Sequence, residues 1–119
     1  MEAAKSQAIS EIFPPEILSL PKVEVPVAGV SGYCLKNDEK QVVFFVFEEG
    51  VSVPDHTHCE QKGMVISGEM MIEIEGQTNL YQEGDNYVIP GDVNHRVNFS
   101  QRTVLIDMSA APDRYTVSP

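Results

Sequence analysis

From about residue 30 onward, the sequence is a series of short β-type segments separated by turn signals, and this spacing restricts the chain to an all-β fold. Residues 69–75 alternate most clearly, with apolar side chains that can face a core and glutamates that can face water. Residues 41–47 are apolar on both faces. We therefore expect the interior to cover one face, and the N-terminal segment or a second subunit to cover the other. Short strands at such spacing are typical of a sandwich or barrel.

The first 27 residues are punctuated by proline and predict an extension outside this barrel. Apolar residues from Ala8 to Phe13 share a helical face, and Pro14-Pro15 should end that helix. In residues 22–27, valines alternate with other residues, which predicts an edge strand or a strap; a loosely packed tail is the alternative. We expect an N-terminal extension or strap over residues 1–27, a barrel over 28–110 and a C-terminal tail over 111–119.

Charge and cysteine content narrow the possible partners and the compartment. The formal net charge of −10 argues against nucleic acid and anionic membranes, and against a highly anionic ligand without local compensation. The sequence has no apolar run long enough to span a bilayer, and its first residues lack the apolar region of a signal peptide. Cys34 and Cys59 are too few for a disulfide framework. These features predict a cytoplasmic protein that binds neither nucleic acid nor membrane.

All three histidines fall in two short segments. His56 and His58 are two residues apart, and His95 follows in Pro90-Gly91-Asp92-Val93-Asn94-His95. If residues 56–58 continue a strand, both imidazoles point to the same face, and a returning strand could bring His95 to them. Imidazole is the commonest side-chain ligand of transition metals. The sequence therefore predicts a metal site formed by the three histidines.

These segments resemble the two conserved motifs of the cupins, and the chain resembles a small single-domain bacterial cupin of the RmlC-like superfamily. Gly50 to Gly68 matches G-x5-H-x-H-x3,4-E-x6-G in its glycines and histidines. Gly84 to His95 matches G-x5-P-x-G-x2-H in its first glycine, its proline and its histidine, with Asp92 where the motif has the second glycine. The resemblance implies a double-stranded β-helix, or jelly-roll barrel, with one divalent transition metal inside: iron, manganese, nickel, zinc or copper.

The chain departs from the first motif at the fourth metal ligand. Counting back from Gly68 places Gln61 where the family has glutamate, and the preceding loop is one residue short. The resemblance therefore implies the ligand set His56, His58, Gln61 and His95. Glu60 is the alternative to Gln61, because an unbroken strand would bring it into phase with His58.

Three imidazoles and one carboxamide are all neutral, so a bound metal would stay strongly electrophilic and would attract chelating oxygen ligands. This favours a metal-dependent enzyme, a dioxygenase, isomerase or lyase, acting on a small oxygenated molecule. The sequence places no convincing general base except Glu60, so a non-catalytic binding or sensing module is the alternative. The apolar surface predicted for residues 42–47 and the strap favours a homodimer.

Overall fold

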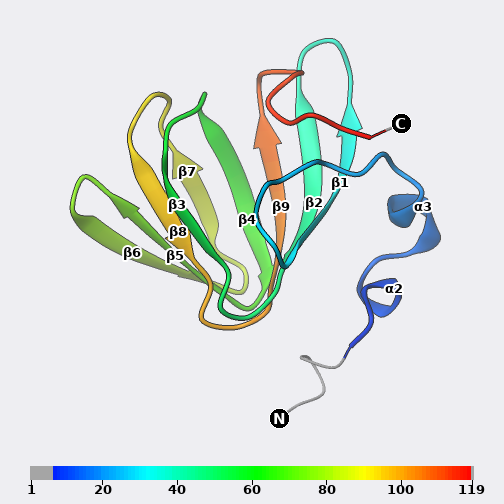
Figure 1. Cartoon of the computed structure of the whole chain (residues 1–119), viewed down its shortest axis with the longest axis horizontal. Helices are drawn as coiled ribbons and strands as arrows, with labels where there is room; N and C mark the ends of the chain where they lie inside the picture. The colour runs from blue at the N-terminus through cyan, green and yellow to red at the C-terminus, as the bar shows by residue number, and fades with distance from the viewer. Residues whose placement is uncertain (1–6, 119) are drawn as a thin grey trace.

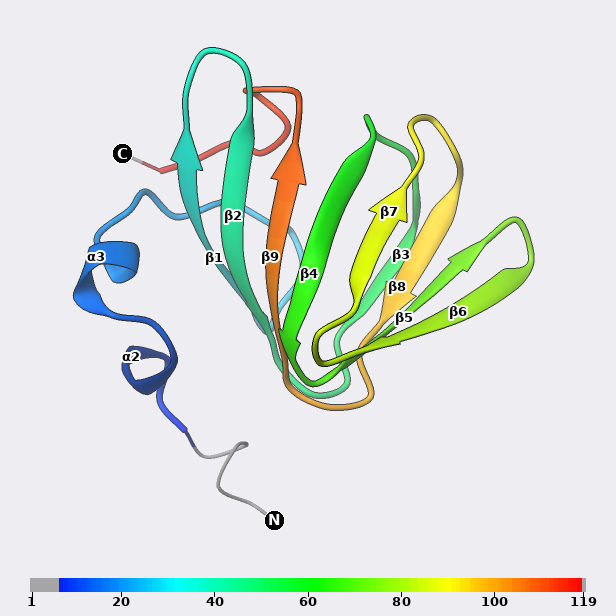
Figure 2. The same ribbon diagram turned by 180° about the vertical axis from the view of Figure 1, so that it is seen from behind.

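The computed structural model describes residues 7–118, whose strands form two antiparallel sheets facing one another (Figures 1 and 2). Residues 1–6 of the predicted extension and Pro119 of the predicted tail lie outside the described residues. The all-β prediction is confirmed. The strands are β1 (Val30–Lys36), β2 (Gln41–Phe47), β3 (Ser52–His56), β4 (Gln61–Ser67), β5 (Glu69–Ile74), β6 (Gln77–Gln82), β7 (Asn86–Ile89), β8 (His95–Asn98) and β9 (Thr103–Ser109).

The chain alternates between the two sheets and wraps them around a common core. One sheet has the strand order β1-β2-β9-β4-β7 and the other the order β3-β8-β5-β6. From β2 to β9 the chain changes sheet at every connection except the β5–β6 hairpin. The sheets approach each other at the lower edge of Figure 1 and separate toward the upper edge. The end of β3 and the start of β8 lie at this wider end.

The N-terminal segment covers part of the outer face of the five-stranded sheet. It contains two short helices, α2 (Ile9–Ile12) and α3 (Pro15–Leu18). Between them, buried Phe13 makes edge contacts with the rings of Tyr33 and Phe44, each at a centroid distance of 6.1 Å. One face of β2 therefore packs under this segment, as one of the two alternatives predicted. The sequence did not predict α3, which begins at Pro15 because proline is well accommodated in a first helical turn.

Residues 22–24 form a strap held by isolated bridges, not a regular strand. Lys22 pairs with Tyr33, and Val23 pairs with Val117 of the C-terminal segment. A Cβ atom on Gly32 would lie 2.4 Å from the Val23 side chain, so the strap can lie this close only because residue 32 is glycine. The C-terminal segment is irregular, as predicted, and the buried side chain of Gln41 binds the backbone N–H and C=O of Tyr115. Residues near both ends of the described chain thus contribute to the wall of the barrel.

Within residues 7–118, no helix has the length and apolar character needed to cross a membrane.

Candidate metal centre

Two of the three histidines face each other across neighbouring strands. His56 ends β3 and is paired with His95 at the start of β8, and their ring centroids are 4.2 Å apart. The register of this strand pair shifts between Val53 and His56. Beside the histidines, Arg96 donates two hydrogen bonds to the Asp55 carboxylate, at 2.9 and 3.1 Å, and so links the two strands. The local pairing therefore fixes two imidazoles side by side.

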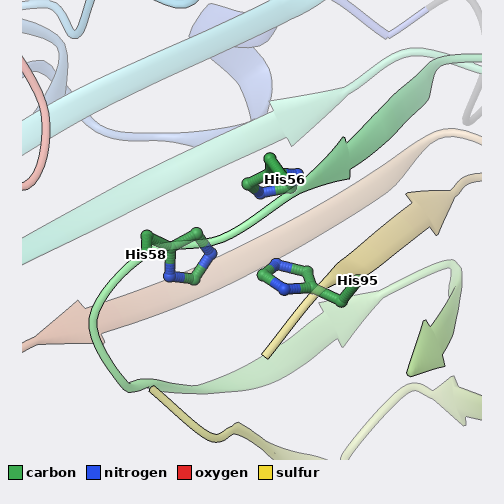
Figure 3. Close-up of side chains that lie close together, drawn as sticks. All are labelled: His56, His58 and His95. Carbon is green, nitrogen blue, oxygen red and sulfur yellow. The ribbon is translucent and has the colours of Figure 1, made fainter. Parts of the chain in front are cut away.

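The third histidine lies in a loop, which corrects the prediction that His56 and His58 share a strand face. β3 ends at His56, and His58 lies beyond it. The backbone N–H of Asp92 donates to the His58 carbonyl at 2.8 Å and holds this loop against the turn before β8. The His58 ring centroid lies 5.0 Å from that of His56 and 4.5 Å from that of His95. The three rings therefore converge, but through a loop contact and not through strand alternation (Figure 3).

Backbone carbonyls determine which nitrogen of each ring can bind a metal. The Nδ1 atoms lie 2.8 Å from the Pro54 carbonyl for His56, 2.6 Å from the Cys59 carbonyl for His58, and 3.0 Å from the Val93 carbonyl for His95. A carbonyl only accepts, so each Nδ1 must carry the proton, and in a neutral ring the Nε2 lone pair stays free.

The environment keeps two of these rings neutral. Burial lowers the pKa of His58 to about 4, although the hydrogen bond to the Cys59 carbonyl acts in the opposite direction. Burial also lowers the pKa of His95. Within residues 7–118, the buried Nε2 atom of His95 has no hydrogen-bond partner. Since a buried polar atom without a partner is costly, and one ligand atom from each ring lies within 4.8 Å of the others, the three histidines fit a metal ion.

Gln61, the residue assigned as fourth ligand, lies on β4 and lines the same cavity as the three histidines. Its Nε2 donates to Asp107, and its Oε1 accepts a hydrogen bond from Arg114. A carbonyl oxygen has two lone pairs, so this contact leaves one for a metal. Glu60 is exposed and does not line the cavity. The choice of Gln61 stays a prediction.

The cavity beside the histidines has a volume of about 460 Å³ and mostly apolar walls. Strand β9 contributes one charged residue to this cavity, the buried Asp107. Its carboxyl group accepts hydrogen bonds from Tyr87, at 2.9 Å, and from Gln61. Tyr87 reaches Asp107 across Gly63, which is paired with both residues in the sheet. A Cβ atom on Gly63 would lie 2.3 Å from the Tyr87 hydroxyl oxygen. Glycine is therefore required for this contact.

Burial raises the pKa of Asp107 to about 7, against the opposing effect of its hydrogen bond from Tyr87. Its carboxyl group can therefore hold or release a proton near neutral pH. This corrects the expectation that no carboxylate other than Glu60 is placed for acid–base chemistry. Strand alternation offered a signal, because Asp107 is in phase with the inward residues Thr103 and Leu105.

Arg114 is the second residue that the sequence did not indicate. It lies in the C-terminal segment, lines the cavity, and its guanidinium carbon is 4.1 Å from the centroid of the Tyr115 ring. Its charge contributes, after burial, to the lowered pKa of His58. The segment that carries Arg114 has no regular periodicity, so no pattern in the sequence could place it at the site.

The sequence model of the family described as "Cupin domain" matches residues 43–108, which is more than half of the chain. The chain belongs to the cupin family. No curated protein matches this cupin at a significant level. The family match and the two-sheet structure together confirm the predicted jelly-roll fold.

Solved structures of other proteins share this fold. An RmlC-like cupin from Shewanella frigidimarina is 26% identical, with a TM-score of 0.68, over 78% of this chain and 86% of that one. KdgF from Halomonas sp. is 22% identical, with a TM-score of 0.66, over 76% and 87% of the two chains. A cupin superfamily protein from Desulfitobacterium hafniense is 20% identical, with a TM-score of 0.65, over 75% and 84%. At these identities, the last two comparisons show the fold alone.

Proposed function

We propose that this cupin is a metal-dependent enzyme that moves a proton on a small oxygenated molecule, as an isomerase or a lyase does. The observation that carries the proposal is the presence of three converging imidazoles and a buried carboxyl group in one cavity. A dioxygenase does not need a proton-transfer group of this kind, whereas an isomerase or a lyase does. The alternative is a binding or sensing module that uses the same cavity without chemistry.

His56, His58 and His95 would hold one divalent iron, manganese, nickel, zinc or copper ion through their Nε2 atoms, with Gln61 as fourth ligand. When bound, such a metal supplies a Lewis acid that polarises a carbonyl or hydroxyl oxygen.

The other residues of the cavity would transfer the proton, position the proton-transfer group and exclude water. Asp107 holds a proton or accepts one from the substrate carbon, because its pKa of about 7 allows both states near neutral pH. Tyr87 and Gln61 donate hydrogen bonds that keep the carboxyl group of Asp107 in position. Aromatic and aliphatic side chains, including Phe45, Phe99 and Ile89, exclude water from the reacting groups.

Proton exchange in deuterium oxide tests this proposal without knowledge of the natural substrate. A panel of ketoses and hydroxy-keto acids is incubated with the metal-containing protein, and loss of the proton next to the carbonyl is followed by NMR. We expect exchange with at least one compound, and we expect Asp107→Asn to abolish it while metal content is unchanged. His58→Ala, which removes a predicted ligand, should lose both exchange and metal.

The binding-module alternative predicts another pattern. In that case compounds of the panel bind at the metal, but neither exchange nor turnover occurs in the wild-type protein. Undiminished exchange in Asp107→Asn would also overturn the assignment of the proton-transfer group.

We also propose that the protein is a homodimer in a reducing compartment such as the cytoplasm. Met64, Ile66, Val88 and Met108 are each more than 40% exposed on β4, β7 and β9, and exposed apolar patches often mark contact surfaces. The free thiols of Cys34 and Cys59 fit a reducing compartment. Light scattering should report a dimer, and Met64→Lys should favour the monomer.

A further inference from the structure

Most of the charged residues that line the cavity are acidic. Glu24, Asp55 and Asp107 contribute carboxyl groups, and Arg114 is the one lysine or arginine among the described residues of the wall. The whole chain has 18 acidic and 8 basic residues, with a formal net charge of −10. Arg114 is half-buried, and partial removal of a cation from water has a cost that a polar or anionic partner can offset.

Arg114 acts on Asp107 only at a distance: burial raises the pKa of Asp107 and the charge of Arg114 lowers it, but the two side chains are not hydrogen-bonded to each other. The two oxygens of Asp107 accept hydrogen bonds from Tyr87 and Gln61, and Tyr115 adds a longer one of 3.4 Å. Arg114 reaches Gln61 instead, so Gln61 lies between the guanidinium group and the carboxyl group. Arg114 therefore makes no hydrogen bond to a carboxylate in the described part of the chain.

The contacts of Arg114 fix its orientation but leave part of the group available. Its Nε donates to Gln61, and the guanidinium plane lies over the Tyr115 ring. Tyr115 is held in turn by both backbone hydrogen bonds to the Gln41 side chain. Within residues 7–118, the two terminal amino groups of Arg114 have no hydrogen-bond partner. Two parallel N–H donors held in a fixed plane are the arrangement that binds a carboxylate through both of its oxygens.

We propose that Arg114 binds a carboxylate of the substrate, so that this cupin acts on small oxygenated carboxylic acids with a second, chelating end at the metal. This inference rests on the proposed function and names the substrate class for it. Arg114 also supplies the local positive charge that an anionic ligand needs in a chain of net charge −10. Arg114 and the predicted metal share the carboxamide oxygen of Gln61, so the carboxylate end and the metal end of a small substrate can be held close together.

Pairs of acids that differ only in the remote carboxylate test the proposal. Malate and 2-hydroxyglutarate have the same chelating hydroxy-acid end as 2-hydroxybutanoate and 2-hydroxypentanoate, and carry a second carboxylate at two different distances. Calorimetric titration into the metal-containing protein gives the affinity of each compound. We expect one of the two dicarboxylates to bind about 10- to 100-fold tighter than its matched monocarboxylate, since hydrogen bonds between charged groups contribute about 1.5–3 kcal/mol.

Arg114→Gln removes the charge and should reduce this preference to less than about threefold, because the dicarboxylates should lose more affinity than the monocarboxylates. A structural role would instead weaken all four ligands together. Arg114→Lys, which keeps the charge but not the planar donor pair, should give an intermediate preference and serves if the glutamine variant does not fold. Equal affinities for the matched acids in wild type, or a preference that survives in both variants, would overturn the assignment.

A failure of the proposed function gives a different result. If purified protein holds no metal and binds none, the metal-dependent function is wrong, and Arg114 is then tested alone with glutarate and butyrate on the metal-free protein. Tighter binding of glutarate, lost in Arg114→Gln, would support the carboxylate site; equal binding would overturn it.

Discussion

Replacing Asp107 with asparagine should make the protein increasingly stable relative to wild type as the pH rises from acid to slightly alkaline values. Burial raises the pKa of Asp107 to about 7 in the folded protein, whereas an aspartate in an unfolded chain has a pKa of about 3.9. At a pH between these two pKa values, Asp107 keeps its proton in the folded state and has lost it in the unfolded state. The stability of the wild-type protein therefore falls as pH rises through this range, and the whole penalty is present above the folded pKa.

The size of this effect follows from the two pKa values. A difference of about three pKa units corresponds to about 4 kcal/mol of unfolding free energy. Roughly 2–3 kcal/mol of this falls between about pH 5 and pH 8, a range above the sequence pI of about 4.5. Asparagine does not titrate, so Asp107→Asn removes this part of the pH dependence. The variant also places an amide nitrogen or oxygen opposite Gln61 and Tyr87, and any hydrogen bond lost there is a cost that does not change with pH.

Urea unfolding of the metal-free proteins at a series of pH values measures the effect. The difference in unfolding free energy between Asp107→Asn and wild type should grow by roughly 2–3 kcal/mol from the acid to the alkaline end. The lowered pKa values of His58 and His95 contribute to both proteins in the same way and cancel in the difference. Curves that stay parallel within about 1 kcal/mol would refute the argument, because Asp107 would then titrate as in an unfolded chain.

Three further predictions concern the metal centre and its support. His58→Ala should reduce bound metal to a small fraction of the wild-type content, measured by elemental analysis, because the carbonyl of Cys59 leaves the His58 Nε2 atom free as a ligand; full metal content would contradict this. Gln61→Ala should weaken metal affinity more than Glu60→Ala in a chelator competition, and the reverse order would assign the fourth ligand to Glu60. Gly63→Ala should destabilise the protein by about 2–4 kcal/mol in urea unfolding, because the new Cβ would lie 2.3 Å from the Tyr87 hydroxyl oxygen and 2.5 Å from the Ile106 carbonyl oxygen; a change below about 1 kcal/mol would show that the sheet yields there.

Strands with a regular alternation could be predicted from the sequence alone. In β5, Met70 and Ile72 are buried, as the pattern indicates, whereas Glu73 is half-buried and the exposed Glu75 lies just after the strand. The same kind of signal fails where a turn residue begins a helix, as at α3, since proline stops one helix and starts another. Local sequence patterns therefore predict most of the strands, but they do not predict the helix that follows Phe13.

The candidate site could be predicted only in its metal-binding half. The spacing of His56, His58 and His95 identified the three imidazoles, although a loop and not a strand positions His58. The other half depends on contacts between distant parts of the chain. Asp107 and Arg114 reach Gln61 over separations of 46 and 53 residues. Strand alternation indicates that Asp107 faces inward, but no local pattern encodes either contact with Gln61, because the contacts arise when β4 pairs with β9 and the C-terminal segment folds back over the cavity.

The carboxamide of Gln61 faces two partners of opposite hydrogen-bonding character. Its oxygen accepts from Arg114, and its nitrogen donates to Asp107. The glutamate that the cupin motif has at this position has no donor when ionised, so it would repel Asp107 in a buried space. The glutamine at position 61 and the aspartate at position 107 therefore depend on each other, because the buried carboxyl group needs a hydrogen-bond donor opposite it. Across cupin sequences, glutamine at the position of Gln61 should occur together with a carboxylate at the position of Asp107. The presence of both residue types can then identify relatives that share this buried pair.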